Sequence, residues 1–264
     1  VKRLIFSVLA VLLVAAVGFF ALSKRANGPE SGQNNGTSNG AENQALKPTI
    51  EITTPSAYLV SDSGEKTELK DGETIAPPVT IELSDKGAAN VNFPDGSTAR
   101  IRYGSKFTLT QADYDATTGK ANTGFFLSVG RIWSKVIELA TPDSSWEVQT
   151  SNAVATVRGT AFDSEVTASS TLFVGSEHEV EIDPIDPKTK ERLKDKGLGL
   201  NEGKIVRIEA KILTDILAGK RRLATSTLPD DEKNTNWHLG NEKMDGHVNE
   251  FVKGMRDRGL KGKD

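Results

Sequence analysis

The chain has 264 residues, a net charge of −3 and no cysteine, which excludes disulfides, zinc-thiolate sites and thiol nucleophiles. The near-neutral charge leaves no clustered basic surface of the kind that nucleic acid requires, so we predict no nucleic-acid partner. Hydrophobic residues make up only 36%, which indicates that part of the chain stays unpacked, while the length allows one large or two small domains.

The chain starts with a short basic head and continues as an uncharged apolar run from Leu4 to Leu22. At about 1.5 Å per residue this run nearly spans a bilayer core of about 30 Å. A cleaved signal peptide is the competing interpretation, with Ala21-Leu22-Ser23 as its cleavage site, but the run is long and Lys24-Arg25 follow at once. We therefore predict a signal anchor over residues 1–25, with one transmembrane helix in the cell membrane, its N-terminus inside and the rest extracytoplasmic.

Residues 26–47 are rich in Gly, Asn and Ser and contain almost no apolar side chain. Such a segment buries too little surface to offset the entropy of ordering it. We predict a flexible tether with a coil span of roughly 25 Å.

Residues 48–208 form a predicted β-domain. Short alternating stretches such as Val79–Leu83 and Ala89–Phe93 are separated by turn signals about every 8–12 residues. This pattern is typical of an all-β roll, sandwich or solenoid. Thr171–Val174 and Glu179–Ile182 are predicted to form a hairpin, and the charged residues 183–197 a surface loop.

The string Leu-x-x-Gly recurs three times, and an apolar residue of β type follows each occurrence. The three strings are Leu69–Gly72, Leu127–Gly130 and Leu200–Gly203. A repeated corner would explain them, with Leu filling the core and Gly supplying a positive φ. Chance recurrence is the alternative.

Residues 209–264 are predicted to form a helical tail. Apolar residues at Ile208, Ile212, Leu213, Ile216 and Leu217 have helical spacing, and Gly219 ends the pattern. A linker from Ala224 leads to a last helix over Asp245 to Arg258, with its apolar residues on one narrow face. That face, formed by Val248, Phe251, Val252 and Met255, either packs on the β-domain or binds a partner.

The sequence offers no catalytic or metal-binding pattern. A calcium loop starting at Asp113 would need Gly at its sixth position and Glu at its twelfth, where the chain has Thr118 and Gly124. The three histidines, His178, His238 and His247, are predicted to be surface residues. His238 and His247 lie nine residues apart, unlike the four-residue spacing of a helical metal pair. We predict no metal site, no cofactor and no enzymatic activity.

The central stretch runs from Trp146 to Val166. Trp146 and Val148 alternate with polar residues, as in a half-buried strand, and a second strand pattern leads into Arg158-Gly159-Thr160. A glycine inside a strand pattern indicates a bulge or a backbone that passes close to another segment. We predict a β-turn-β unit in the core, and a ligand-contacting loop is the alternative.

The run from Thr150 to Phe162 resembles the signature of the FecR domain family, a strand ending in Thr, a small apolar run, Arg-Gly-Thr and an aromatic residue. Pro94–Leu109 and Leu127–Trp133 resemble further segments of the same family, and the likeness covers roughly Glu51 to Ile182. The resemblance implies a FecR-type β-domain in which the motif residues are structural. These residues are Arg158, Gly159, Thr160 and Phe162.

The best-known members of the family are transmembrane signal regulators that combine a cytoplasmic domain controlling a sigma factor with an extracytoplasmic sensing domain. Only three residues precede the apolar run here, so we expect no cytoplasmic anti-sigma domain. The resemblance implies a non-catalytic extracytoplasmic module that binds a protein or senses a signal.

A cell-envelope carbohydrate or peptidoglycan binder is the alternative function. It requires aromatic rings that line an open groove, and buried rings would count against it. The candidate rings are Tyr103, Tyr114, Trp133 and Trp146.

Overall fold

The computed structural model describes residues 46–257. The predicted anchor over residues 1–25, nearly all of the predicted tether and residues 258–264 of the tail lie outside the described residues. Within residues 46–257, no helix combines the length and the apolar character needed to cross a bilayer.

The described chain is mainly β, as predicted, and its 16 strands form one sheet that divides at β8 into two branches, here named layer A and layer B. Layer A contains, in sheet order, β1 (Thr49–Thr54), β5 (Ala88–Asn92), β6 (Thr98–Ile101), β8 (Ala121–Val136), β11 (Thr160–Val166), β12 (Ser170–Gly175), β15 (Lys204–Glu209) and β16 (Ser226–Thr227). Layer B contains, in sheet order, β3 (Lys66–Glu68), β2 (Ala57–Val60), β4 (Val79–Leu83), β7 (Lys106–Tyr114), β8, β9 (Ser145–Gln149), β10 (Ala153–Val157), β13 (Val180–Pro184) and β14 (Leu198–Leu200). The helical segments are η1 (Lys194–Lys196), α1 (Ala210–Leu217), α2 (Asp230–Lys233) and α3 (Asn236–Asp257).

Strand β8 belongs to both layers because its two halves pair with different strands. Its first half pairs with β7 and, in parallel, with β9 in layer B. Its second half pairs with β6 and β11 in layer A. The 16-residue strand therefore joins the two layers along its own length.

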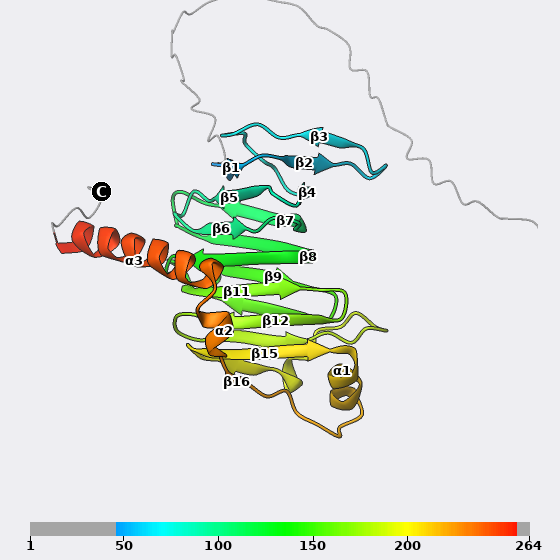
Figure 1. Cartoon of the computed structure of the whole chain (residues 1–264). Helices are drawn as coiled ribbons and strands as arrows, with labels where there is room; N and C mark the ends of the chain where they lie inside the picture. The colour runs from blue at the N-terminus through cyan, green and yellow to red at the C-terminus, as the bar shows by residue number, and fades with distance from the viewer. Residues whose placement is uncertain (1–45, 258–264) are drawn as a thin grey trace, which may run out of the picture. The chain divides into compact units, whose positions relative to one another are not determined.

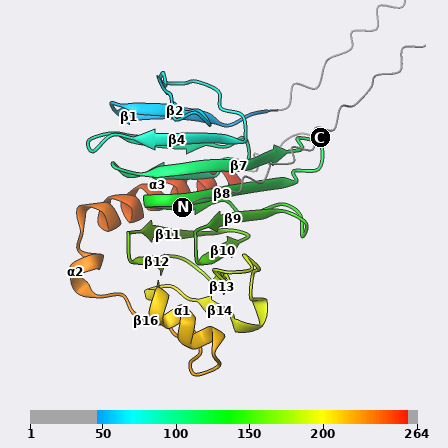
Figure 2. The same ribbon diagram turned by 90° about the vertical axis from the view of Figure 1, so that its right-hand side faces the viewer.

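In each layer the strands follow nearly in chain order, because the chain passes back and forth between the layers as it advances. Figures 1 and 2 show the strands stacked from β1 at one end to β16 and α1 at the other, with α3 returning to the level of β8. The roll is thus built from successive windings around one core.

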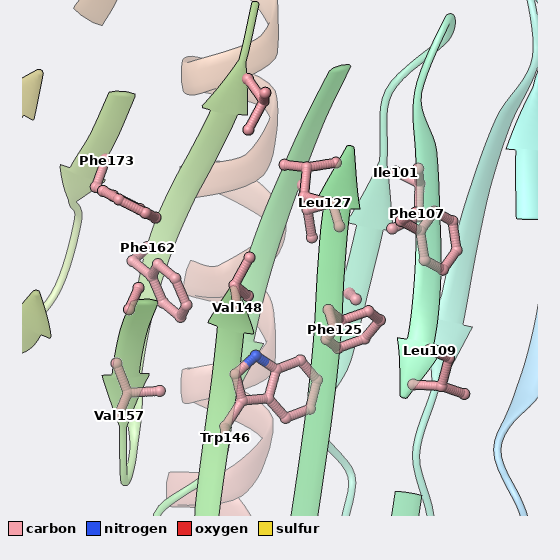
Figure 3. Packing of buried hydrophobic residues seen from close by; sticks show 14 of the residues in the cluster. Ile101, Phe107, Leu109, Phe125, Leu127, Trp146, Val148, Val157, Phe162 and Phe173 are labelled. Carbon is pink, nitrogen blue, oxygen red and sulfur yellow. The ribbon is translucent and has the colours of Figure 1, made fainter. Parts of the chain in front are cut away.

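Aromatic and aliphatic side chains from both layers fill this core (Figure 3). Trp146 is 1% exposed, and its ring packs edge-on against Phe93 with centroids 4.8 Å apart. Phe125 packs against the same indole at 5.4 Å and against Phe93 at 5.9 Å. The alternation that predicted a half-buried strand at Trp146 and Val148 is confirmed, since both side chains point into the core.

The Leu-x-x-Gly recurrence is a repeated structural feature. Each leucine is buried and each glycine has a positive φ, as predicted. The φ values are +76° at Gly72, +99° at Gly130 and +68° at Gly203. Gly130 differs from the others because it lies within β8, where an added Cβ would come 2.6 Å from the Cβ of Ser105.

The predicted hairpin between residues 171 and 182 is wrong. Strand β12 pairs with β11 and β15 in layer A, whereas β13 pairs with β10 and β14 in layer B. The connection over Gly175 to His178 therefore crosses between the layers. Gly175 passes so close to Asn201 that an added Cβ would lie 2.9 Å from that residue's carbonyl carbon. A short polar connection between two strand patterns looks the same in sequence whether it turns within a layer or crosses.

The charged segment 183–197, predicted as a surface loop, is anchored by one half-buried side chain. The Arg192 guanidinium donates to the carboxylate of Asp183 at 2.6 Å and to that of Glu147 at 2.8 Å. Asp183 is 1% exposed, so Arg192 supplies the counter-charge for a buried carboxylate.

The first predicted tail helix is confirmed as α1, which buries Leu213 and Ile216 and is followed by Gly219 at φ +69°. The second begins at Asn236, nine residues before the predicted start at Asp245. Gly240 and Gly246 lie within α3, where an added Cβ at either position would meet nothing within 4 Å.

Candidate functional site

The Arg158-Gly159-Thr160 turn connects β10 in layer B with β11 in layer A. Gly159 has a φ of +151°, and an added Cβ would come 2.7 Å from the Cα of Glu138. The amide of Leu139 donates to the carbonyl of Arg158 at 2.8 Å, which fixes the segment after β8 against the turn. The close backbone approach that the sequence indicated at Gly159 is thus present, and only glycine fits it.

Thr160 and Phe162 hold the same turn from inside. The Thr160 hydroxyl donates to the carbonyl of Glu177 in the connection between the layers. Phe162 is fully buried in the core between β11 and its neighbours. Arg158 is exposed, and it forms no ion pair with the side chains that the structure describes.

A groove of about 1330 Å³ opens beside this turn and is here named the Arg158 groove. Its walls are the segment after β8, the Arg158 turn, the connection around His178 and the C-terminal half of α3. The walls include the exposed apolar residues Ala140 and Pro142. At one side of the groove the Lys135 ammonium bonds both carboxylate oxygens of Glu177, at 2.6 and 2.8 Å.

The groove does not assemble a nucleophile with a base. The Thr160 hydroxyl is committed to a backbone carbonyl, and the Thr141 hydroxyl is bonded to Ser144 at 2.8 Å. Nucleophilic catalysis needs a hydroxyl in hydrogen-bond reach of a base such as His178, and neither threonine forms that pair. The groove's combination of apolar walls and an exposed guanidinium suits binding of a peptide segment.

The four candidate aromatic residues do not line one groove. Trp133 is 0% and Trp146 1% exposed, each inside the protein. Tyr103 is 50% exposed and lies before β7, whereas Tyr114 is half-buried at the far end of β7. The nine residues of β7 lie between the turn that carries Tyr103 and the end that carries Tyr114, and at about 3.3 Å per residue they span roughly 30 Å. The open aromatic surface that a carbohydrate binder requires is therefore not formed by these rings.

A second polar site lies where α3 covers the outer face of layer A. The carboxylate of Asp245 accepts from Arg100 at 2.6 Å through one oxygen and from the Trp133 indole N–H at 2.8 Å through the other. Asn241, one turn earlier in α3, accepts from the same guanidinium at 3.3 Å. Arg100 and Trp133 are here named the carboxylate fork. Burial raises the pKa of the Asp245 carboxyl above its ordinary value, although Arg100 and Trp133 favour the ionised form.

A neighbouring cluster connects α2 to the same face of layer A. The Arg131 guanidinium donates to Asp163 at 2.7 Å and also to Glu232 of α2. The Trp237 indole donates to Asp163 at 3.0 Å. Burial raises the pKa of Asp163 despite these donors. One of its oxygens, Oδ1, has no hydrogen-bond partner within the described residues.

The prediction of surface histidines is wrong for His238, which lies on the inner face of α3 and is 1% exposed. It is confirmed for His178 and His247, which are exposed. The Nε2 of His238 lies 3.1 Å from Glu242, and the His238 ring packs against Trp133. Across the described part of the chain no group of three or more acidic or histidine side chains could hold a metal ion.

Comparison with known families assigns the central part of the chain. Residues 79–180 match the family model described as FecR protein. This part of the chain is a FecR domain. It runs from the first residue of β4 to the first residue of β13, so it contains β8, the Arg158 turn and most of the groove. The resemblance identified from the sequence is confirmed.

Among solved structures, the chain is similar to two crystal structures, at 1.65 and 2.50 Å resolution, of a protein from Parabacteroides distasonis described as a proposed anti-sigma factor. Each match has 12% identity and a TM-score of 0.40, and covers 56% of this chain and 59% of that chain. The chain thus spans less than two thirds of the length of these structures. No curated protein sequence matches it.

The carboxylate fork and the Arg131 cluster were missed by the sequence analysis. Arg100, Arg131 and Lys135 occupy alternate positions of predicted strands, where charged side chains are normally read as solvent-facing. A signal was available in β8, where Arg131, Trp133 and Lys135 share one face, because an aromatic residue between two cations rarely faces water alone.

Proposed function

We propose that this chain is a membrane-anchored, extracytoplasmic FecR-domain protein that acts as a non-catalytic protein-binding or signal-sensing module. The observation that carries the proposal is the position of the Arg158 groove, which lies against the turn formed by the domain's own Arg-Gly-Thr motif. The apolar run from Leu4 to Leu22 supports the anchoring, and it is a property of the sequence.

The size and lining of the groove favour a protein segment over a small molecule. Small-molecule pockets typically enclose about 300–1,000 Å³ and bury most of the ligand, whereas this groove is larger and open at the surface. Ala140 and Pro142 offer apolar contacts, and Arg158 offers an exposed guanidinium for a carboxylate. An extended acidic or C-terminal segment of a partner fits these features.

The predicted topology is tested by protease treatment of intact cells that express the full chain with a C-terminal tag. Loss of the tag from outside, with the remainder kept in the membrane fraction, is the expected result. A tag that is protected until the cells are lysed would place the domain inside the cell and overturn the extracytoplasmic assignment.

Protein binding in the groove is tested by placing a photo-crosslinking amino acid at Arg158 in the full chain, in its own host. The control places it at Thr117, an exposed position in the turn between β7 and β8. We expect a discrete crosslinked adduct from position 158 and none from position 117. Equal crosslinking from both positions, or none from 158, would contradict binding in the groove.

A further inference from the structure

The described contacts between helix α3 and layer A are mainly polar, unlike those of a helix that packs for stability. Among the α3 side chains that the structure describes, the most buried are His238, Asn241 and Asp245, each at most 2% exposed. Of the predicted apolar face, Val248 is half-buried, and the side chains of Phe251, Val252 and Met255 lie outside the described part of the chain. The apolar Leu239 and Met244 face outward and are 45% and 44% exposed. A surface helix that contributes to a core shows the opposite arrangement, with its apolar stripe inward.

The described side chains of α3 do not contribute to the core of the roll. The two apolar clusters are formed by the strands, α1 and connecting segments such as those that carry Leu69, Ile75 and Phe93. Removing α3 from layer A would therefore leave the packing between the layers in place.

The contacts of α3 give it specificity more than binding strength. A buried ion pair gains little net stability because desolvation of both charges offsets their attraction, but a mismatched partner is strongly disfavoured. Docking also leaves His238 Nδ1 buried without a hydrogen-bond partner within the described residues, and such a group costs stability. A second helix with the same carboxylate could replace α3 at a small free-energy difference.

The carboxylate fork is the part of the face that α3 alone satisfies. Arg131 keeps Asp163 and Lys135 keeps Glu177 when α3 leaves. The recorded hydrogen bonds of the Arg100 guanidinium, by contrast, all run to Asn241 and Asp245 of α3. An undocked α3 would thus expose one unpaired guanidinium beside one free indole N–H, a geometry that fits the two oxygens of a carboxylate.

We propose that the outer face of layer A is a docking site for a carboxylate-bearing helix of a protein partner, and that α3 is the built-in helix which this partner displaces. The partner helix carries Asp or Glu for the fork and an amide side chain one turn earlier, as α3 does with Asn241 and Asp245. Because Asn249 and Lys253 of α3 line the Arg158 groove, displacement also opens one wall of that groove. This inference rests on the proposed protein-binding function and adds its partner chemistry and its regulation.

Two variants of the full chain in detergent micelles distinguish loss of α3 docking alone from loss of docking together with damage to the carboxylate fork. Asp245→Ala and Arg100→Ala remove the same ion pair, but only the second damages the receiving face. We expect α3 amides to exchange hydrogen at least tenfold faster in both variants than in the wild type, with β9 amides unchanged. Unaccelerated α3 exchange in both variants would show that the ion pair does not hold the helix and would overturn the proposal.

The probe for the empty face is a fluorescein-labelled peptide of residues 230–257. By anisotropy it should bind the Asp245→Ala chain at least tenfold more tightly than the Arg100→Ala chain. Binding to the wild type should also be weaker, because the tethered α3 competes at a high effective concentration. A peptide that itself carries Asp245→Ala should lose binding.

Equal peptide binding to both variants, or binding to neither, would overturn the proposal. If Asp245→Ala also accelerates hydrogen exchange in β9, Asp245→Asn replaces it in the comparison with Arg100→Ala. Asparagine keeps the size of the side chain and an oxygen that can accept from Trp133. A wild-type dimer that disappears in Asp245→Ala would assign the face to a second copy and overturn the partner helix. A crosslinked adduct at position 158 without peptide binding would refute this inference and leave the proposed function standing.

Discussion

Substitution Gly130→Ala tests whether the close approach inside β8 holds the two layers together. The backbone φ of +99° would cost an alanine about 1–2 kcal/mol. The added Cβ would also come 2.6 Å from the Cβ of Ser105, and relieving such an overlap costs about 1–3 kcal/mol. Together these effects predict a loss of about 2–5 kcal/mol in the free energy of unfolding.

The matched control is Gly203→Ala, at a corner of the same Leu-x-x-Gly type with φ +68° and nothing within 4 Å of the added Cβ. It should lose only the backbone cost of about 1–2 kcal/mol. For a domain of this size each kcal/mol lowers Tm by about 2–4 °C. Thermal unfolding of both full-length variants in the same detergent, followed by circular dichroism, measures the difference. Equal Tm losses for the two variants would refute the reasoning, because the contact with Ser105 would then cost nothing.

Three further predictions test the core and the buried charges. Trp146→Ala removes the indole that packs in the core cluster and should cost about 3–5 kcal/mol in urea unfolding; a loss below about 1 kcal/mol would contradict the packing. Arg192→Ala leaves the Asp183 carboxylate buried without its counter-charge and should cost about 1–3 kcal/mol, whereas Lys66→Ala, at an exposed pair, should cost less than about 1 kcal/mol. In the folded protein the pKa of the Asp245 carboxyl is raised above 3.8, so folding favours its protonated form. This favourable effect on the free energy of unfolding is fully present below pH 3.8, and it is lost as the pH rises through the pKa of the folded state. The stability of the wild type relative to Asp245→Asn should therefore be greater at pH 4 than at pH 7 in thermal unfolding, and the reverse order would refute the sign.

The mainly β fold could be predicted from the sequence because alternation and glycine positions are local properties. Leu127-x-x-Gly130 placed both a buried side chain and a positive φ correctly, since only glycine adopts that φ without strain. The path of the chain between the layers could not be predicted in the same way. Residues 175–178 have the composition of a hairpin turn, and the crossing brings Gly175 against Asn201, which lies further along the chain.

The family motif was found from the sequence because Arg158, Gly159 and Thr160 are contiguous. The carboxylate fork could not be found in this way. Its residues and their partner, Arg100, Trp133 and Asp245, lie on three different elements, and more than a hundred residues separate Arg100 from Asp245 in the sequence. A charged residue in a strand pattern predicts exposure unless a later segment covers it. Here α3 covers it, and α3 begins at Asn236, nine residues before its predicted start.

The sharing of β8 between the layers has a consequence for biosynthesis. Strands β1 to β7 can pair among themselves as two separate groups, since β1, β5 and β6 belong to one layer and β2, β3, β4 and β7 to the other. Strand β8, which joins the two groups, is synthesised after both of them, and its end lies 22 residues beyond the end of β7. At about 5–20 residues per second, the ribosome needs roughly one to four seconds to add these residues. During that interval the free edges of β6 and β7 have no partner. Nascent chains that stall before Val136 should therefore be the species that chaperones must protect from aggregation.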